Sequence, residues 1–310
     1  MSDHIVDPSD EQRHVPDPDD LWNESYYADF VNGDGGWGGW LRLGLYPNRQ
    51  VAWWTTYIVG PDRAGVCSVN YTVPVPAGSG LVASDTDTRI ALEVIEPLKA
   101  FRIAAQAPAE VMARPEDVYA GVPGTPVTLD LDLTWTTDGQ PYHYELTTRY
   151  EIPCLVSGTV TIGDETLTVE GQGQRDHSWG VRDWWSFGWC WSSARLDDGT
   201  RVHLADIRMP DFRVGFGYLQ VPSAGEVLPV TSLDVTEELG AHGFPVSARI
   251  EIETEVRSLG IDVTPLAFGP VLLRNDDGRT SDFPRAMVRY RADDGREGMG
   301  WIEWNQPAPA

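Results

Sequence analysis

The sequence predicts an all-β protein made of two antiparallel barrel-like or sandwich-like halves with little helix. Three observations support this fold class. Short runs with alternating apolar residues recur along the chain and are bounded by turn residues, as in half-buried strands. The 31 glycines and 23 prolines are spread without a period, which suits many short strands joined by turns. Convincing helices longer than two turns are scarce, so the strands must supply the core.

The individual strands follow from local pattern. Three successive strands are expected at 39–47, 50–60 and 65–75, and a strictly alternating strand at 246–256. The clearest strand of the first half is 125–137, where every second residue from Val127 to Trp135 is apolar. Pro97 divides 89–106 into two strands, because proline interrupts regular structure. The best short helix candidate is 115–121.

Turn signals organise the chain into hairpins and halves. Hairpins are expected about Asp138-Gly139, Gly163-Asp164, Asp198-Gly199 and Asp294-Gly295. Residues 1–20 are acidic and contain three prolines, which predicts a flexible arm. We expect one β domain over 21–153 and a second over 154–310, with the motif described below in the second.

Composition narrows the possible partners and compartments. The 47 acidic and 23 basic residues give a formal charge of −24, which repels nucleic acids and anionic membranes. The three cysteines are far apart, and no apolar run is long enough for a signal peptide or a membrane helix. These observations predict a cytoplasmic protein with no nucleic-acid partner and no membrane insertion. Lysine occurs only at Lys99, and this arginine bias indicates a bacterial source. The sequence leaves the oligomeric state open.

One stretch concentrates the residues suited to chemistry, GQGQRDHSWGVRDWWSFGWCW at 171–191. Continued strand alternation from Val169 places Arg175, His177 and Trp179 on the inner face. A bulge would turn Asp176 inward instead of His177, and the sequence does not choose between them. Glycines at 171 and 173 leave space for a ligand or for another backbone. A second inner face is expected from Trp185, Trp189 and Trp191.

Two interpretations of this stretch remain open. In the first, Asp176 and His177 form a general acid–base pair in a dry cavity, and indole rings stabilise positive charge on an apolar substrate, which suits proton addition to an olefin. In the second, the arginines and aspartates form buried ion pairs that fix a domain junction, and the tryptophans are core. The histidines are isolated in sequence and no metal-ligand spacing occurs, so neither a metal nor an organic cofactor is expected. Glu24 and Tyr26 are candidates for the interior lining of the first half.

The run GQGQRDHSWGVRDWW, followed by DDGTRVH, resembles a bacterial family related to carotenoid 1,2-hydratase (hydroxyneurosporene synthase) and the AttH-like proteins. The pieces NESYYADF and GWLRLGLYPN are similar to that family's first domain, so the resemblance covers most of 22–305. It implies two tandem lipocalin-like β-barrels with a ligand cavity.

The resemblance also implies cofactor-free lyase or isomerase chemistry on a hydrophobic olefinic, isoprenoid or terpenoid-like molecule, by hydration, dehydration or cyclisation. Asp176 and His177 are the positions nearest to the aspartate and histidine credited with hydratase chemistry. The substrate-binding candidates are Arg175, Trp179, Trp185, Trp189, Trp191, Glu24 and Tyr26. The alternative is a lipocalin-like protein that binds a hydrophobic small molecule without transforming it.

Overall fold

The computed structural model describes residues 6–222 and 225–309. Within these ranges almost all regular structure is β-strand, which confirms the predicted fold class. One α-helix, α1 (Asp117–Ala120), falls inside the short helix expected at 115–121. The remaining helical pieces are single 3-10 turns, namely η1 (Pro8–Glu11), η2 (Pro47–Arg49) and η3 (Ala241–Gly243).

The chain divides into two compact units. Unit 1 contains residues up to 58, 66–112 and 124–182, and unit 2 contains 59–65, 113–123 and the residues from 183 onward. The boundary expected at 153/154 is therefore corrected to 182/183. The physical reason is that the hairpin after residue 149 is hydrogen-bonded on both sides to strands of the first half, so it completes the first sheet.

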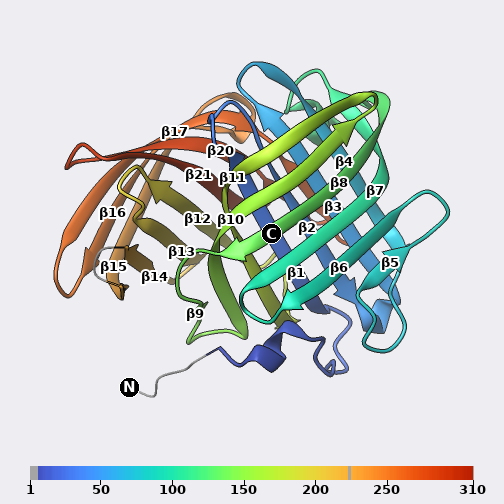
Figure 1. The fold of residues 1–310 in the computed structure, drawn as a ribbon, viewed down its shortest axis with the longest axis horizontal. Coiled ribbons are helices and arrows are strands. Elements are labelled where there is room, and N and C mark those ends of the chain that lie inside the picture. Colours follow the sequence, from blue (N-terminus) through green and yellow to red (C-terminus); the bar gives the residue numbers. More distant parts are fainter. Residues whose placement is uncertain (1–5, 223–224, 310) are drawn as a thin grey trace. The chain divides into compact units, whose positions relative to one another are not determined.

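The unit 1 sheet follows the order β4-β3-β2-β1-β11-β10-β8-β7-β6-β5, and β9 pairs with β10 (Figure 1). β4 also pairs with β7, which closes the path from β4 through β1 and β11 to β7 into a ring. The strands are β1 (Trp22–Asn32), β2 (Gly38–Tyr46), β3 (Val51–Gly60), β4 (Arg63–Pro74), β5 (Val82–Ser84), β6 (Arg89–Glu96), β7 (Ala100–Met112), β8 (Thr125–Thr137), β9 (Tyr142–His143), β10 (Arg149–Ile162) and β11 (Glu165–Val181).

Unit 2 forms a second sheet with the order β12-β13-β14-β15-β16-β17-β20-β21-β19-β18. A further pairing between β12 and β21 closes the first eight of these strands into an antiparallel barrel. The strands are β12 (Gly188–Leu196), β13 (Arg201–Met209), β14 (Phe212–Val221), β15 (Glu226–Leu239), β16 (Pro245–Thr254), β17 (Ser258–Phe268), β18 (Val271–Arg274), β19 (Thr280–Phe283), β20 (Arg285–Ala292) and β21 (Glu297–Pro307).

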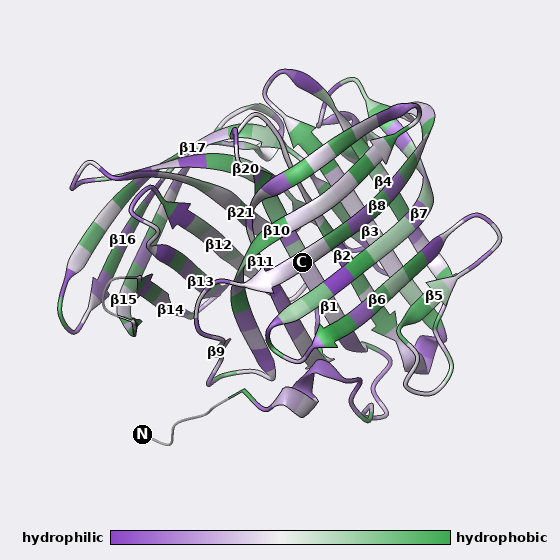
Figure 2. Cartoon of the chain, viewed as in Figure 1, coloured by the Kyte–Doolittle hydropathy of each residue, from purple (hydrophilic) through white to green (hydrophobic). Residues whose placement is uncertain are grey.

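Each unit has its own apolar core, made by the alternation that predicted the strands. Figure 2 shows the alternation as green and purple bands along the arrows. On β8, Leu129, Leu131, Leu133 and Trp135 are at most 3% exposed and join the unit 1 core. On β16, Ile250 and Ile252 join the unit 2 core. The predicted break at Pro97 and the hairpins about residues 163–164, 198–199 and 294–295 are confirmed. In the described residues, no helix has the length and apolarity that a membrane crossing requires.

The acidic N-terminal segment is docked on unit 1 over residues 6–20, although the sequence suggests a flexible arm; residues 1–5 of that arm lie outside the described residues. We call residues 6–20 the arm. Its η1 turn begins after Asp7, whose side chain accepts a hydrogen bond from the Ser9 backbone at 2.8 Å. Glu11 at the end of that turn is 1% exposed, and Val6 belongs to the unit 1 core. The arm therefore contributes side chains to the barrel interior.

Candidate active site in the unit 1 barrel

Strand β11 carries the motif and lies between β1 and β10 (Figure 1). Its register with β10 is unbroken from Arg149 opposite Ser178 to Ile162 opposite Glu165. No bulge interrupts this pairing, so the period-2 alternation continues through the whole motif. His177 consequently points to the barrel interior, and Asp176 points to the opposite face of the sheet.

The glycines of the motif make room for another backbone. A Cβ atom at Gly173 would lie 2.0 Å from the carbonyl oxygen of Asp29 on β1, and one at Gly171 would lie 2.1 Å from that of Val31. These distances are too short for any side chain, and a backbone carbonyl cannot rotate aside as a side chain can. The sequence left open whether these glycines make space for a ligand or for another backbone. In the structure they allow the close approach of strand β1.

His177 is held inside the barrel by a carboxylate and a phenol. Its Nε2 lies 2.7 Å from Oε1 of Glu24, and its Nδ1 lies 3.3 Å from the hydroxyl of Tyr150. The Tyr26 ring stacks on the imidazole with centroids 4.1 Å apart. All four side chains are at most 2% exposed. An imidazole between a carboxylate and a hydroxyl is a geometry that can pass a proton.

Electrostatics fix the proton positions in this group. Burial works to raise the pKa of Glu24, but hydrogen bonds from His14 and His177 outweigh it and hold that pKa below its usual value. Glu24 is therefore ionised and can only accept, so Nε2 of His177 is the donor in this pair. When His177 is neutral, its Nδ1 then accepts from Tyr150. Burial, reinforced by the charge of Glu24, raises the pKa of Tyr26 well above its usual value, so its phenol stays protonated.

Arg175, two residues before His177 on the same face, forms a buried ion pair with the arm. Its guanidinium nitrogens lie 2.7 and 3.2 Å from the two carboxylate oxygens of Glu11. The guanidinium also lies 5.1 Å from the centre of the Phe101 ring, a cation–π contact. Burial opposes the charge on Arg175, but the Glu11 carboxylate compensates, and the net effect raises the arginine pKa.

The arm supplies a second side chain to the same interior. Nδ1 of His14 lies 2.8 Å from Oε1 of Glu24, and the His14 backbone N–H donates to Oε2 at 2.7 Å. The His14 ring stacks on Trp179 with centroids 3.6 Å apart and planes 9° from parallel. Hydrogen bonds and ion pairs thus link His14, Glu24, His177 and Tyr150, and Arg175 with Glu11. We call these six residues the interior polar chain.

Part of this site is predictable from the sequence. The structure brings together five of the predicted site residues, namely Glu24, Tyr26, Arg175, His177 and Trp179. It adds Glu11, His14, Tyr150 and Phe101. Tyr150 precedes the alternating Ile152, Cys154 and Val156, and that pattern on β10 could have identified it as inward-facing. Glu11 and His14 carry no such signal, because they lie in a polar segment outside the sheet.

Asp176 lies in a different polar group on the other face of the sheet, so the expected Asp176–His177 pair does not form. Its Oδ2 accepts from Arg149 at 2.7 Å, and Arg149 also binds Glu151 at 2.8 Å. Gln174 donates to the second oxygen of Glu151 at 2.8 Å. Burial raises the pKa of Asp176 to about 7, although Arg149 acts to lower it. Asp176 is thus a titratable group near neutral pH, and it lies on the opposite face of the sheet from His177.

The predicted tryptophan wall is divided between the two units. Three of the predicted tryptophans belong to unit 2, which begins at residue 183 in this part of the chain, namely Trp185, Trp189 and Trp191. The last strand of unit 1, β11, ends at Val181, and the first strand of unit 2, β12, begins at Gly188. Trp185 lies in the connecting turn, where its backbone N–H donates to Asp183 at 2.9 Å. Trp189 donates from Nε1 to Glu303 at 2.9 Å. Trp191 packs against His203, with the ring centroids 5.6 Å apart. Trp179 is the member of the predicted wall that lies in unit 1.

Three side chains of the interior polar chain could also hold a metal ion. Nδ1 of His14, a carboxylate oxygen of Glu24 and Nε2 of His177 lie within 4.8 Å of one another. Two imidazoles and a carboxylate suit zinc and similar ions. Sequence spacing gave no hint of this cluster, because His14 and His177 come from the arm and from β11. In the structure both imidazole nitrogens hydrogen-bond to Oε1 of Glu24.

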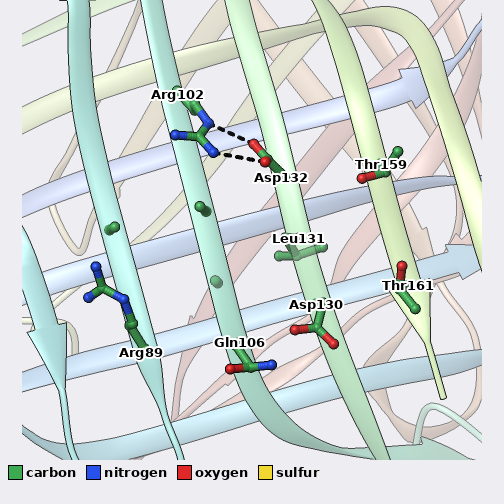
Figure 3. A pocket seen from close by; sticks show the side chains of 11 residues that line it. Arg89, Arg102, Gln106, Asp130, Leu131, Asp132, Thr159 and Thr161 are labelled. Atoms are coloured by element: carbon green, nitrogen blue, oxygen red, sulfur yellow. Dashed lines mark hydrogen bonds and ion pairs between the residues drawn. The ribbon is translucent and has the colours of Figure 1, made fainter.

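The outer face of the unit 1 sheet carries a separate hollow of about 410 Å³. Figure 3 shows its polar lining on β6, β7, β8 and β10, with Arg102 joined to Asp132 by two hydrogen bonds of 2.7 and 2.8 Å. None of the predicted site residues lines this hollow. It is therefore distinct from the interior polar chain.

Comparison with solved structures supports the fold. A protein described as an AttH candidate from Nitrosomonas europaea superposes with a TM-score of 0.68 at 16% identity, covering 98% of both chains. Kievitone hydratase from Nectria haematococca superposes with a TM-score of 0.64 at 12% identity, and the match covers 98% of this chain and 94% of the hydratase. The protein CghA superposes with a TM-score of 0.56 at 11% identity, and the match covers 96% of this chain and 94% of CghA. At these identities the likeness shows a shared AttH-like fold.

No curated protein matches the sequence. The model of one protein family, described as a domain of unknown function (DUF7064), matches residues 7–308. The match covers both units and begins within the segment that places Glu11 and His14 in the barrel. The chain therefore belongs to the DUF7064 family.

Proposed function

We propose that the protein is an acid–base enzyme that acts, without a cofactor, on a hydrophobic olefinic substrate of isoprenoid or terpenoid type. The reaction is hydration, dehydration or cyclisation. The observation that carries the proposal is the buried line Glu24–His177–Tyr150 inside the unit 1 barrel. The fold shared with kievitone hydratase and CghA adds support, as does the predicted kinship with carotenoid 1,2-hydratase.

His177 acts as the proton carrier in this proposal. Glu24 fixes the imidazole orientation and stabilises the imidazolium, as the carboxylate does in hydrolase triads. In hydration, Nδ1 of the imidazolium gives its proton to the Tyr150 hydroxyl while that hydroxyl gives its own proton to one olefin carbon, which leaves a carbocation on the other. Water adds to the cation, and the oxonium formed returns a proton to Nδ1 by the same route. In cyclisation, a second double bond attacks the cation, and a neighbouring carbon returns the proton.

The surrounding rings suit the cationic intermediate. Trp179 can present its indole face to positive charge when His14, which stacks on that ring in the structure, gives way to substrate; the interaction is worth about 0.5–2 kcal/mol. The hydroxyl of Tyr26 is buried and, among the described residues, forms no hydrogen bond, so it can donate one to the attacking water. The remaining apolar core of unit 1 excludes bulk water from a reactive cation.

The test uses His177→Asn and Glu24→Gln, with His242→Asn as the matched control. His242 is exposed on η3 and has a positive φ of 60°, which asparagine tolerates. We expect both site variants to lose turnover of terpenoid olefins by about 10²–10⁴-fold, measured by mass spectrometry as gain of water or formation of an isomer. The control retains wild-type turnover.

Three outcomes would reject the proposal as stated. Full activity of folded His177→Asn would remove the proton carrier. Loss of activity in Asp176→Asn alone would move the acid to the opposite face of the sheet. A wild-type protein that binds such olefins and never transforms them would be the lipocalin-like binding protein.

A further inference from the structure

We propose that Glu11 and His14 occupy the two polar subsites of a ligand site inside the unit 1 barrel, and that the ligand enters by displacing the arm. The ligand class is a planar ring that carries a hydrogen-bond donor and is joined to a carboxylate. The inference concerns binding alone and deepens the proposed function by adding an anionic, planar head group to the substrate.

The first subsite is built for an anion. Arg175 is 3% exposed and its paired anion is Glu11, a residue of the arm. A buried guanidinium without a counter-charge is strongly unfavourable. Any molecule that replaces Glu11 must therefore bring a negative charge of its own. A carboxylate fits, because it can take both of the parallel hydrogen bonds that Glu11 accepts.

The second subsite is built for a flat ring with a donor. Glu24 is 1% exposed and ionised, so it requires hydrogen-bond donors. The His14 ring meets this need from Nδ1 while lying flat on Trp179. A phenol or a nitrogen heterocycle could do the same, since each combines a planar face with an O–H or N–H donor. His177 hydrogen-bonds the same Glu24 oxygen as His14, so a ring in this subsite lies beside the proton carrier.

The attachment of the arm permits exchange. Residues 15–20, the part of the arm that precedes β1, are exposed, and Val15 is 91% exposed. Arg13 binds backbone carbonyls of the loop between β4 and β5, at 2.6 Å for Gly78. Two side chains of the arm are buried, those of Val6 and Glu11, and the His14 side chain is half-buried. A ligand that satisfies Arg175 and Glu24 thus replaces the contacts that hold Glu11 and His14 inside, while Arg13 and the Asn48 side chain, which donates to the carbonyls of Asp17 and Asp19, keep the rest of the arm attached.

The first experiment measures binding of 4-hydroxybenzoate by calorimetry in EDTA, which prevents a metal from bridging His14, Glu24 and His177. The wild type is compared with the double variant Glu11→Ala/His14→Ala. Asp17→Asn, with an exposed side chain on the same segment, is the matched control. We expect the double variant to bind at least about tenfold more tightly than the wild type and the control, because the arm no longer competes. 4-Methoxybenzoate lacks the donor and 4-hydroxybenzamide lacks the charge, so each should bind more weakly.

The second experiment uses the wild type alone, in case the double variant does not fold. The backbone N–H groups of His14 and Leu98 donate to the carboxylates of Glu24 and Glu11. Saturating 4-hydroxybenzoate should speed hydrogen exchange at both amides and leave the Leu204 amide in β13 unchanged.

Equal affinity in the wild type and a folded double variant would overturn the inference. Unchanged exchange at His14 and Leu98 would overturn it as well. Failure of the proposed function is separable, because a protein that binds the probe with the expected arm dependence but turns over no olefin upholds this inference alone.

Discussion

The ion pair between Glu11 and Arg175 predicts an unequal response to removal of its two partners. Glu11→Gln leaves the arginine charge on β11, 3% exposed and fixed by the sheet. Loss of one partner of a buried pair costs about 3–5 kcal/mol. In a unit of this size that corresponds to a fall in the unfolding midpoint of roughly 6–20 °C. Arg175→Met should cost less, because the freed Glu11 sits on an arm that can turn it into water.

The assay is thermal unfolding of the single and double variants, followed by circular dichroism at constant pH. The double variant Glu11→Gln/Arg175→Met should lie close to the wild type, because it buries no unpaired charge. Acetate should stabilise Glu11→Gln more than the wild type. Equal losses of stability in Arg175→Met and Glu11→Gln would contradict this prediction, and so would a loss in the double variant equal to the sum of the two single losses.

Three further predictions concern single positions. Folded Asp176 keeps its proton up to a pH of about 7, whereas in the unfolded chain the side chain loses its proton near pH 3.8. The wild-type free energy of unfolding should therefore fall as the pH rises between these two values. When unfolding is measured at pH 5 and at pH 8, Asp176→Asn should show a smaller fall than the wild type. Gly173→Ala should destabilise by about 1–3 kcal/mol or more, because its Cβ would strike a carbonyl of β1; Gly65→Ala, with its nearest contact at 3.7 Å, is the control for the same denaturation curve. Arg102→Ala should cost less than about 1 kcal/mol in that assay, because its pair with Asp132 is solvent-exposed; a larger loss would contradict the screening argument.

Local pattern predicted the strands and the faces of the motif, because side-chain alternation is a property of each strand alone. It placed Arg175, His177 and Trp179 on one face without knowledge of their neighbours. It could not supply the partner strand, because pairing of β1 with β11 depends on contacts across the whole unit. The domain boundary was misplaced for the same reason.

The polar members of the site were harder to predict than the apolar ones. Glu11 and His14 lie in a segment rich in acids and prolines, and such composition usually marks a solvated chain. Their burial is compensated by Arg175 and Glu24, which are distant in sequence. The pairing of Asp176 with His177 failed because adjacent residues on an unbulged strand point to opposite faces.

The contact between Glu11 and Arg175 also has a consequence for synthesis of the chain, since it joins residues 164 positions apart. At about 5–20 residues per second, β11 leaves the ribosome roughly 10–30 s after the arm. During this interval β1 lacks one of its two neighbours and exposes a hydrogen-bonding edge. The growing chain must therefore hold its first strand in an unfinished sheet until β11 emerges, and β11 completes the sheet and pairs with the arm in the same step.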